Sequence, residues 1–350
     1  MTTPDPALAS AFLVLLEGEA GFGEPELTAL ARAEVMERLA AGAEVNGWYQ
    51  GRTLLSQAVG WKRADMVELL LDHGAEVNAI THAPEGRLFA EPVAAEAYDP
   101  EIVRLLAARG ADFAAFDRDV MAVATGADRI PAQNLPRDAT RFAPVQRGDR
   151  NPQPMVNPFY IEQIRSFDSA YGGLRRHFGE GANPHPWQLS PAFSFERFGR
   201  TVTRLPDGRL VLIAGEHEDS YDPDFCIYND VCVLDGAGGV EYFTYPVEDF
   251  PPTDFHTATL MGDHILIIGN LGYRGQRQDG ITQVLRLDLK SWRVTRVQTT
   301  GDNPGWISRH SATLQDGEII ASGGKIDPGF RDFEGVHALD TKRLRWRRIS

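Results

Sequence analysis

Apolar residues recur at the spacing of a helix in the first third of the chain. Three runs place Val, Leu, Ile and Met at positions i, i+3 and i+4, along one face of a helix: residues 35–39, 66–71 and 102–106. Each run is followed by a glycine that opens a similar short motif, at Gly42, Gly74 and Gly110. Glycine suits the left-handed residue that ends a helix. The pattern predicts repeated helical units whose glycines are 32 and 36 residues apart.

From residue 195 onward this pattern is replaced by one in which apolar and polar residues alternate with a period of two. Three units share a first strand, an apolar second strand and a third strand that ends in Asp. Their corresponding first-strand residues, Thr201, Thr257 and Ser311, are 56 and 54 residues apart. Period-two runs separated by turns are typical of antiparallel strands. The sequence therefore predicts an α+β multidomain protein, in which a helical domain precedes three four-stranded antiparallel sheets within residues 195–350.

The helical units resemble the ankyrin repeat, whose period is about 33 residues. The match is closest from Gly51 to Asn78, although Leu54 and Ser56 stand where the family usually has Pro and His, which suggests a looser turn. Residues 79–90 form an insertion, and Pro92 and Pro100 fall where helix interiors are expected. The resemblance implies a short ankyrin-like stack over residues 1–118, with residues 7–18 as its N-terminal cap.

Ankyrin-like stacks usually bind proteins through their turn tips and their concave helix face. Trp48 and Tyr49 lie at an expected tip, and Trp61 lies between the two helices of the second unit. Large aromatic residues at exposed tips are good anchors for a partner. Packing of Trp48 against the neighbouring repeat is the alternative.

The strand units resemble the kelch repeat, which has about 50 residues and four strands per propeller blade. The residues that carry this resemblance are His256 and His310 near the first strand, Gly323-Gly324 after the second strand, and an aromatic residue such as Trp346 after the third strand. The resemblance implies a kelch-like domain of three blades over residues 191–350, a partial propeller. In kelch-like blades the histidine usually bonds neighbouring backbone.

Closed single-chain propellers have about four to eight blades, so three do not close a ring. Three arrangements remain open for these blades. Either a further blade is hidden in residues 120–195, or two chains complete a ring as a homodimer, or the stack stays open and is covered by the ankyrin-like part. Residues 119–190 are expected to form a linker with a docking helix near 158–171. That helix should begin at Asn157-Pro158, where Asn caps it and Pro fits the first turn, and end at Gly172-Gly173.

Charge and composition limit the classes of partner that the chain can bind. The chain has 35 Lys and Arg against 49 Asp and Glu, a net charge of −14, and residues 1–118 hold nine against nineteen. This balance argues against nucleic-acid binding and favours a basic protein partner. No apolar run approaches the ~20 residues that span a bilayer, and the apolar run at 11–16 lacks the flanks of a signal peptide. Two cysteines give no disulfide framework, so we expect a cytoplasmic protein.

The densest polar cluster lies between the second and third strands of the first blade. Its candidate residues are Glu216, His217, Asp219, Tyr221, Asp222 and Asp224. Acidic oxygens at alternate positions suit Ca²⁺, but the glycine and the final glutamate of an EF-hand loop are missing. The cluster therefore predicts a partner-facing or solvated loop, with no metal and no cofactor. Other loops add four further binding candidates: Asp254, Tyr273, Arg274 and Trp306.

No sequence motif points to catalysis. Phosphate-cradling glycine loops, a Gly-x-Ser-x-Gly elbow and His-Glu-x-x-His are all missing from the sequence. We expect a non-catalytic protein–protein interaction protein, either an adaptor or an immunity-type inhibitor of a basic partner, that binds neither nucleic acid nor membrane. The alternative is an enzyme or a small-ligand binder, for example of carbohydrate, at the propeller loops.

Overall fold

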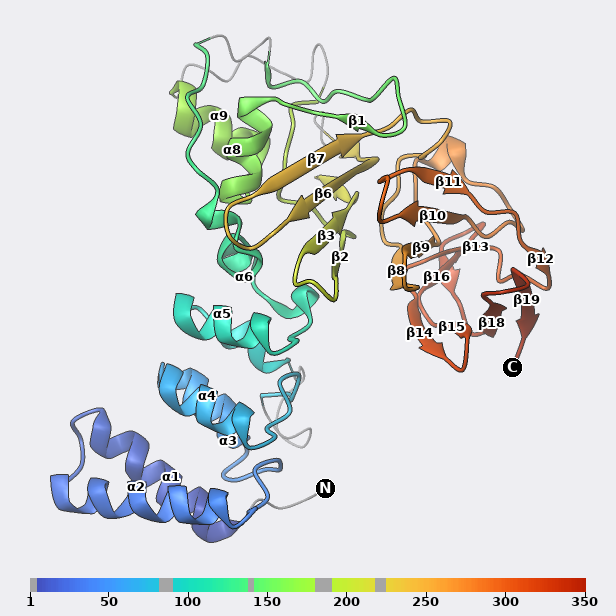
Figure 1. Cartoon of the computed structure of the whole chain (residues 1–350). Coiled ribbons are helices and arrows are strands. Elements are labelled where there is room, and N and C mark those ends of the chain that lie inside the picture. Colours follow the sequence, from blue (N-terminus) through green and yellow to red (C-terminus); the bar gives the residue numbers. More distant parts are fainter. Residues whose placement is uncertain (1–4, 82–90, 138–141, 180–190, 218–224) are drawn as a thin grey trace. The chain divides into compact units, whose positions relative to one another are not determined.

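The chain forms two compact units, Met1–Thr125 and Gly126–Ser350. The computed structural model describes residues 5–81, 91–137, 142–179, 191–217 and 225–350. The first unit is helical and the second is built mainly from antiparallel sheets (Figure 1). The α+β multidomain class predicted from the sequence is therefore confirmed. Among the described residues, every helix is too short or too polar to cross a membrane.

The first unit consists of helix pairs joined by turns. Its elements are α1 (Pro6–Glu19), α2 (Pro25–Ala40), α3 (Leu54–Gly60), α4 (Ala64–Asp72), η1 (Val93–Glu96), α5 (Pro100–Ala108), η2 (Phe113–Ala115), η3 (Arg118–Val120) and α6 (Met121–Thr125).

A repeated contact links successive helix pairs. Asn46 donates to the carbonyl of Gly74 at 3.0 Å and accepts from the amide of Glu76 at 2.8 Å. Asn78 makes the same pair of bonds to Gly110 and Asp112, at 3.3 and 2.9 Å. The predicted left-handed glycines are present, with φ of 79° at Gly42, 89° at Gly74 and 93° at Gly110. The period read from the sequence is therefore also a period of hydrogen bonds.

Two local expectations for this unit are wrong. Pro100 does not interrupt a helix, because it is the first residue of α5, and Asp99 caps that helix by accepting from the amides of Glu101 and Ile102. The turn before α3 is also braced rather than loose. The Ser56 hydroxyl donates to the carbonyl of Thr81 at 3.2 Å and accepts from Arg52 at 2.9 Å.

The second unit contains three larger sheets and two small ones. The strands of the larger sheets are β1 (Gln153–Pro154), β2 (Thr201–Arg204), β3 (Leu210–Ile213), β6 (Asp230–Leu234), β7 (Val240–Thr244), β8 (Thr257–Leu260), β9 (His264–Ile268), β10 (Val284–Asp288), β11 (Val294–Arg296), β12 (Thr300–Gly301), β14 (Ser311–Gln315), β15 (Glu318–Ser322), β18 (Val336–Asp340) and β19 (Arg345–Arg348). Those of the small sheets are β4 (Glu216–His217), β5 (Cys226–Ile227), β13 (Trp306–Ser308), β16 (Lys325–Asp327) and β17 (Arg331–Asp332). Helix η7 (Arg274–Gln276) lies in a loop.

Each larger sheet has the four antiparallel strands expected from the sequence, and we call these sheets blades 1, 2 and 3. Blade 1 is β7-β6-β3-β2, blade 2 is β11-β10-β9-β8, and blade 3 is β19-β18-β15-β14. Strand β1 adds a fifth strand to blade 1, and β12 adds a parallel fifth strand to blade 3. The described residues of the segment 120–195 supply only β1 to these sheets, so they contain no fourth blade.

Apolar faces hold the blades together. Val211, Ile213, Val231 and Val233 of blade 1 share a core cluster with Ile265, Ile267, Leu285 and Leu287 of blade 2. The other face of blade 2, including Leu266 and Ile268, shares a second cluster with Ile319, Leu339 and Trp346 of blade 3. These two layers of buried aliphatic side chains supply the main hydrophobic stabilisation of the unit.

A histidine crosses each interface between blades. Nε2 of His256 lies 2.9 Å from the hydroxyl of Thr201 in blade 1, and Nε2 of His310 lies 3.0 Å from the hydroxyl of Thr257 in blade 2. Both histidines are buried, and burial lowers the pKa of His256 to about 3 and that of His310 to about 4. The partner is thus a threonine side chain of the preceding blade, whereas the sequence reading expected backbone.

The outer face of blade 3 differs from the corresponding faces of blades 1 and 2. Thr313, Ile320, Ala338 and Arg347 form one cross-strand row on it. Arg347 forms an ion pair with Glu318 there, and Ser311 is exposed. This face also carries Ser322, which pairs with Ser311, where blade 1 carries Ile213 and blade 2 carries Ile268, each paired with a threonine.

Residues 126–179 belong to the second unit. Helix α8 (Pro158–Ser166) is capped by Asn157, whose side chain accepts from the amides of Phe159 and Tyr160, as predicted. The helix ends earlier than expected, because Phe167 adopts a left-handed conformation and a second helix, α9 (Ala170–Phe178), follows. The ring of Tyr160 packs edge-on against Tyr242 of β7, so α8 docks on blade 1.

Candidate functional site

Loops from all three blades line a cavity of about 880 Å³ in the second unit, which we call the loop cavity. Blade 1 contributes Glu216 of β4 and Phe225 and Ile227 around β5, and Asp254 precedes blade 2. The remaining lining comes from two turns, at residues 271–279 and 327–330. Four sequence candidates, Glu216, Asp254, Tyr273 and Arg274, therefore come together at one place.

Asp254 is the most unusual group in this cavity. Its side chain is fully buried, although a carboxylate is costly to bury without partners. Oδ1 accepts from the amide of Gly272 at 2.6 Å, whereas Oδ2 has no hydrogen-bond partner among the described residues. Burial raises the pKa of Asp254, and the carboxyl of Glu216 lies within hydrogen-bonding reach of it. Two carboxyl groups within hydrogen-bonding reach of each other favour sharing one proton.

An ion pair and aromatic rings complete the lining. Arg277 pairs with Asp327 at 3.0 Å across the cavity wall. The Tyr273 hydroxyl accepts from the amide of Ile227 at 2.8 Å, and its ring packs edge-on against Phe225. Burial raises the pKa of Tyr273 to about 12, so the phenol stays neutral at physiological pH. Phe330 is partly exposed at the tip of the β16–β17 hairpin.

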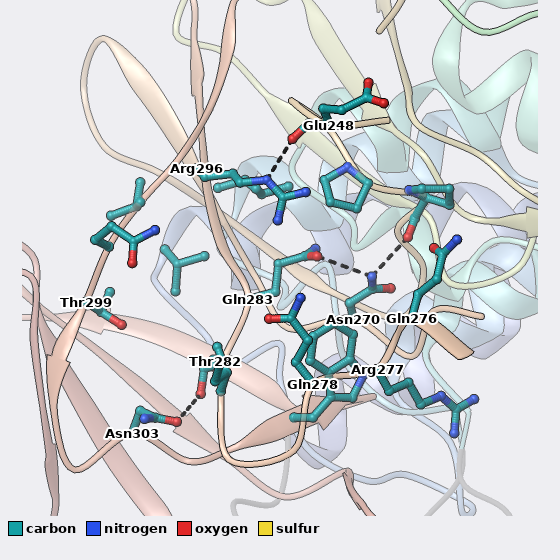
Figure 2. A pocket seen from close by; sticks show the side chains of 18 of the residues that line it. Glu248, Asn270, Gln276, Arg277, Gln278, Thr282, Gln283, Arg296, Thr299 and Asn303 are labelled. Carbon is teal, nitrogen blue, oxygen red and sulfur yellow. Dashed lines mark hydrogen bonds between the residues drawn. The ribbon is translucent and has the colours of Figure 1, made fainter. Parts of the chain in front are cut away.

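A second cavity, of about 680 Å³, lies beside blade 2 and contains many side-chain amides (Figure 2). These amides are used within the protein. Asn270 donates to the carbonyl of Pro252 at 2.9 Å, and Gln283 donates to the hydroxyl of Thr253 at 3.0 Å. The amide side chain of Asn303 accepts from Gly305 and Thr282. Because these buried groups satisfy one another, this cavity presents no orphaned polar atom comparable to that of Asp254.

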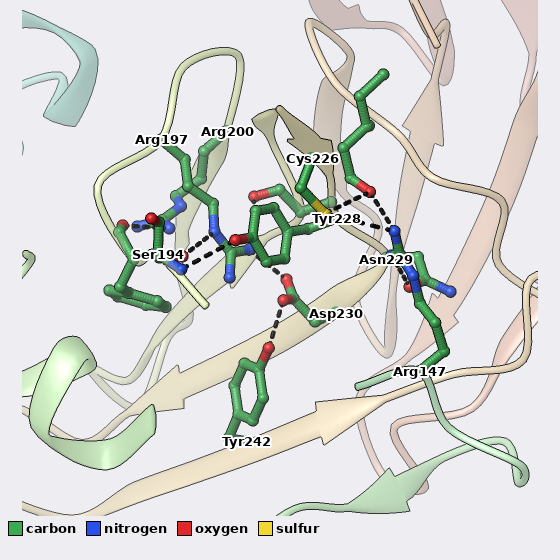
Figure 3. A network of polar contacts seen from close by, with 12 residues as sticks. Arg147, Ser194, Arg197, Arg200, Cys226, Tyr228, Asn229, Asp230 and Tyr242 are labelled. Atoms are coloured by element: carbon green, nitrogen blue, oxygen red, sulfur yellow. Dashed lines mark hydrogen bonds and ion pairs between the residues drawn. The ribbon is translucent and has the colours of Figure 1, made fainter. Parts of the chain in front are cut away.

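A polar network is buried in blade 1 (Figure 3). The guanidinium of Arg197, with a side chain 1% exposed, pairs with Asp230 at 2.7 Å and lies 3.3 Å from the ring centre of Tyr228. Asp230 also accepts from the hydroxyl of Tyr242. Charge pairing and hydrogen bonds compensate for burying these groups, so we assign the network to structural support. It joins the segment before β2 to strands β6 and β7.

The other sequence candidates of the second unit are placed differently. His217 is buried, and its Nδ1 lies 3.0 Å from the carbonyl of Glu196. Trp306, named above as a loop binding candidate, is buried in the amide-rich cavity, where its indole donates to the carbonyl of Leu271 at 3.1 Å. Asp219, Tyr221, Asp222 and Asp224 lie outside the described residues. The described residues contain no group of three or more potential metal ligands.

In the first unit, Trp48 and Tyr49 are half-buried at a turn in which Tyr49 and Arg52 exchange backbone hydrogen bonds of 2.9 and 3.2 Å. Trp61 is exposed and packs edge-on against Phe22, with 6.4 Å between ring centres. Leu27 and Leu30 of α2 are also exposed. We call these two exposed pairs, Phe22 with Trp61 and Leu27 with Leu30, the apolar patch.

Sequence reasoning missed several of these residues. Phe22, Leu27 and Leu30 were overlooked because α2 was treated as a conventional amphipathic helix, although it buries only Ala31, Val35 and Leu39. Asp327 and Phe330 flank a Pro-Gly pair, which is a turn signal between two strands. That signal could have placed them at the same end of the unit as the other loops.

The ankyrin-repeat family model matches residues 50–82. A search of curated proteins found no match. Among solved structures, the chain titled "Structure of YjhT" is similar at 12% sequence identity with a TM-score of 0.34, and the similarity covers 44% of this chain and 52% of that chain. The similar region thus spans about half the length of that protein. The family match includes α3 and α4, and the helical unit therefore contains an ankyrin repeat.

Proposed function

We propose that this is a non-catalytic interaction protein whose helical unit binds a basic partner protein through the apolar patch. An adaptor and an immunity-type inhibitor are both consistent with this mode of binding. The ankyrin repeat supports the proposal, because stacked repeats present extended surfaces to partners. In the second unit, the three blades and their His–Thr contacts support a kelch-like repeat.

The observation that carries the proposal is the exposure of large apolar side chains on an acidic unit. Phe22 is 81% exposed and Leu30 is 67% exposed. Leu27 and Leu30 are three residues apart and so share one side of α2. Clustered exposed apolar residues rimmed by polar ones mark interaction surfaces.

The surroundings of the patch indicate the charge of the partner. Glu24 and Glu26 are exposed next to and in the first turn of α2, whereas the exposed Glu34 is paired with Arg38 at 2.9 Å. Residues 1–118 carry ten more acidic than basic side chains. Apolar anchors supply most of the affinity of an interface, and complementary charge mainly raises the association rate. A basic protein with an apolar contact surface is therefore the expected partner.

The test compares the wild type with the double variant Leu27→Ser/Leu30→Ser. Val156→Ser is the matched control, because Val156 is 92% exposed in the other unit. Proteins captured from the producing cells would be quantified by mass spectrometry, and each that the double variant loses would be purified and measured against the wild type by surface plasmon resonance.

The expected result is a basic protein that binds the wild type and the control, binds the double variant at least tenfold more weakly, and associates more slowly at higher salt. The proposal is overturned if no captured protein depends on the patch. It is also overturned if the dependent protein is acidic, or if its association rate is independent of salt.

A further inference from the structure

We propose that the loop cavity binds a small organic ammonium ion, whose N–H groups bond to Asp254 and Glu216. This site lies in the second unit and is independent of the partner surface proposed for the helical unit.

The first argument is the geometry of Asp254. The cavity places a fully buried carboxyl in its wall, and no N–H or hydroxyl group of the described residues donates to its Oδ2, so that only the Glu216 carboxyl lies within reach of Asp254 there. An unsatisfied buried polar group typically costs about 1–3 kcal/mol. Oδ1 is already fixed by the amide of Gly272, so the orientation of the carboxyl is set before any ligand arrives. A donor entering the cavity would satisfy the remaining oxygen.

The second argument is the charge of the lining. Four carboxyl groups line the cavity, those of Glu216, Asp254, Asp279 and Asp327, against the two guanidinium groups of Arg274 and Arg277. The Arg277–Asp327 pair neutralises itself at 3.0 Å. The lining as a whole thus carries more acidic than basic side chains, an excess that favours a cation.

The third argument distinguishes an organic cation from a metal ion. Ca²⁺ takes six to eight oxygen ligands, and the described residues contain no group of three or more potential metal ligands. Phe225, Tyr273 and Phe330 line the same cavity. Aromatic faces attract ammonium groups and also pack against the carbon atoms that such a ligand carries. A volume of about 880 Å³ is ample for a small molecule.

Proton balance then predicts how affinity depends on pH. Without ligand, two carboxyl groups within hydrogen-bonding reach favour holding one proton between them, and burial, which raises the pKa of Asp254, favours keeping that proton. When R–NH₃⁺ binds between them, that proton passes to solvent and two carboxylates face one ammonium. The other charged or titratable groups lining the cavity are Arg274, Arg277, Asp279, Asp327 and the neutral Tyr273, and Arg309 also acts on Asp254. Affinity should therefore increase with pH as this shared proton is lost.

The experiment is isothermal titration calorimetry on the purified full chain. The amine probes are n-butylamine, putrescine and benzylamine; 1-butanol, glucose and CaCl₂ are the non-amine probes. Asp254→Asn removes the carboxyl while its amide keeps the oxygen that accepts from Gly272 and adds a donor toward Glu216. Asp316→Asn is the matched control, because Asp316 is an exposed aspartate in blade 3. Glu216→Gln is a second variant in case Asp254→Asn does not fold.

We expect at least one amine to bind the wild type and the control, with an affinity that increases when the pH is raised in steps from 5 to 8. We expect Asp254→Asn and Glu216→Gln to weaken that binding at least tenfold. Asp254→Asn should also melt at or above the wild-type temperature at pH 7, because it replaces a strained buried acid. The inference is overturned if no amine binds, if binding survives both substitutions, or if glucose, 1-butanol or CaCl₂ binds in place of the amines.

Discussion

The two interblade histidines should make the second unit sensitive to mild acid. Both are buried and neutral in the folded protein, with pKa values of about 3 for His256 and about 4 for His310. In the unfolded chain a histidine has a pKa of about 6.5. Between these values the unfolded state binds protons that the folded state cannot. The stability contributed by each neutral histidine is therefore present at high pH and is lost as the pH falls below about 6.5 toward the folded pKa.

The size of the effect follows from these values. Each pH unit below the unfolded pKa costs about 1.4 kcal/mol per histidine. Between pH 7.5 and pH 5.0 each histidine should lower the free energy of unfolding by about 2 kcal/mol, and the two together by about 4 kcal/mol. Asp254 acts in the opposite direction, because its raised pKa stabilises the fold as the pH falls. Its contribution cancels when two proteins that both contain it are compared.

The assay compares the wild type with His256→Gln/His310→Gln, whose amides can still bond to Thr201 and Thr257. Unfolding in urea at pH 7.5 and 5.0 would be followed by hydrogen exchange of β9 and β15 peptides, which report on the second unit alone. The wild type should lose about 4 kcal/mol more than the double variant over this interval. Equal losses, within about 1 kcal/mol, would show that these histidines titrate normally and would refute the reasoning.

Two further substitutions test burial. Trp306→Ala should lower the free energy of unfolding of the second unit by about 3–5 kcal/mol, because Trp306 is buried. Trp61→Ala should lower that of the first unit by less than about 1 kcal/mol, because Trp61 is exposed. Urea unfolding of each unit measures both losses, and similar losses would contradict the placement of these rings. Arg197→Met should lower the free energy of unfolding by about 3–5 kcal/mol, because it leaves the buried Asp230 carboxylate without its cation. The double variant Arg197→Met/Asp230→Leu should recover part of that loss. A larger loss in the double variant would mean that the ion pair does not hold the network together.

Repetition made much of the fold predictable from the sequence. The glycine and asparagine motifs recur because the same hydrogen bonds join each helix pair to the next, as Asn46 and Asn78 show. The three strand units recur because each blade has to present apolar faces to its neighbours. A motif that makes the same contact at every repeat is visible in a single sequence.

Features that occur once were harder to predict. The proline at Pro100 was taken as a helix interruption because its capping partner, Asp99, was not considered. The loop cavity combines Glu216, Asp254 and Asp327, which are far apart in sequence and meet only because the blades bring their loops together. Trp306 was chosen as a binding candidate because the sequence pattern places it in a loop. It is instead the first residue of β13 and is buried. Burial of a loop residue depends on its neighbours in space, which local periodicity does not encode.

The outer face of blade 3 makes the stack a starting point for protein engineering. A fourth blade grafted beside it would meet Ser311 and Ser322, where blades 1 and 2 each offer a threonine hydroxyl and an isoleucine. Changing Ser311 to Thr and Ser322 to Ile would restore the pair that blade 2 carries at these positions, Thr257 and Ile268. The added blade would then need one histidine before its first strand, positioned as His310 is, to lock onto the new hydroxyl. Growth of such an array thus depends on two side chains of the receiving blade and one incoming imidazole.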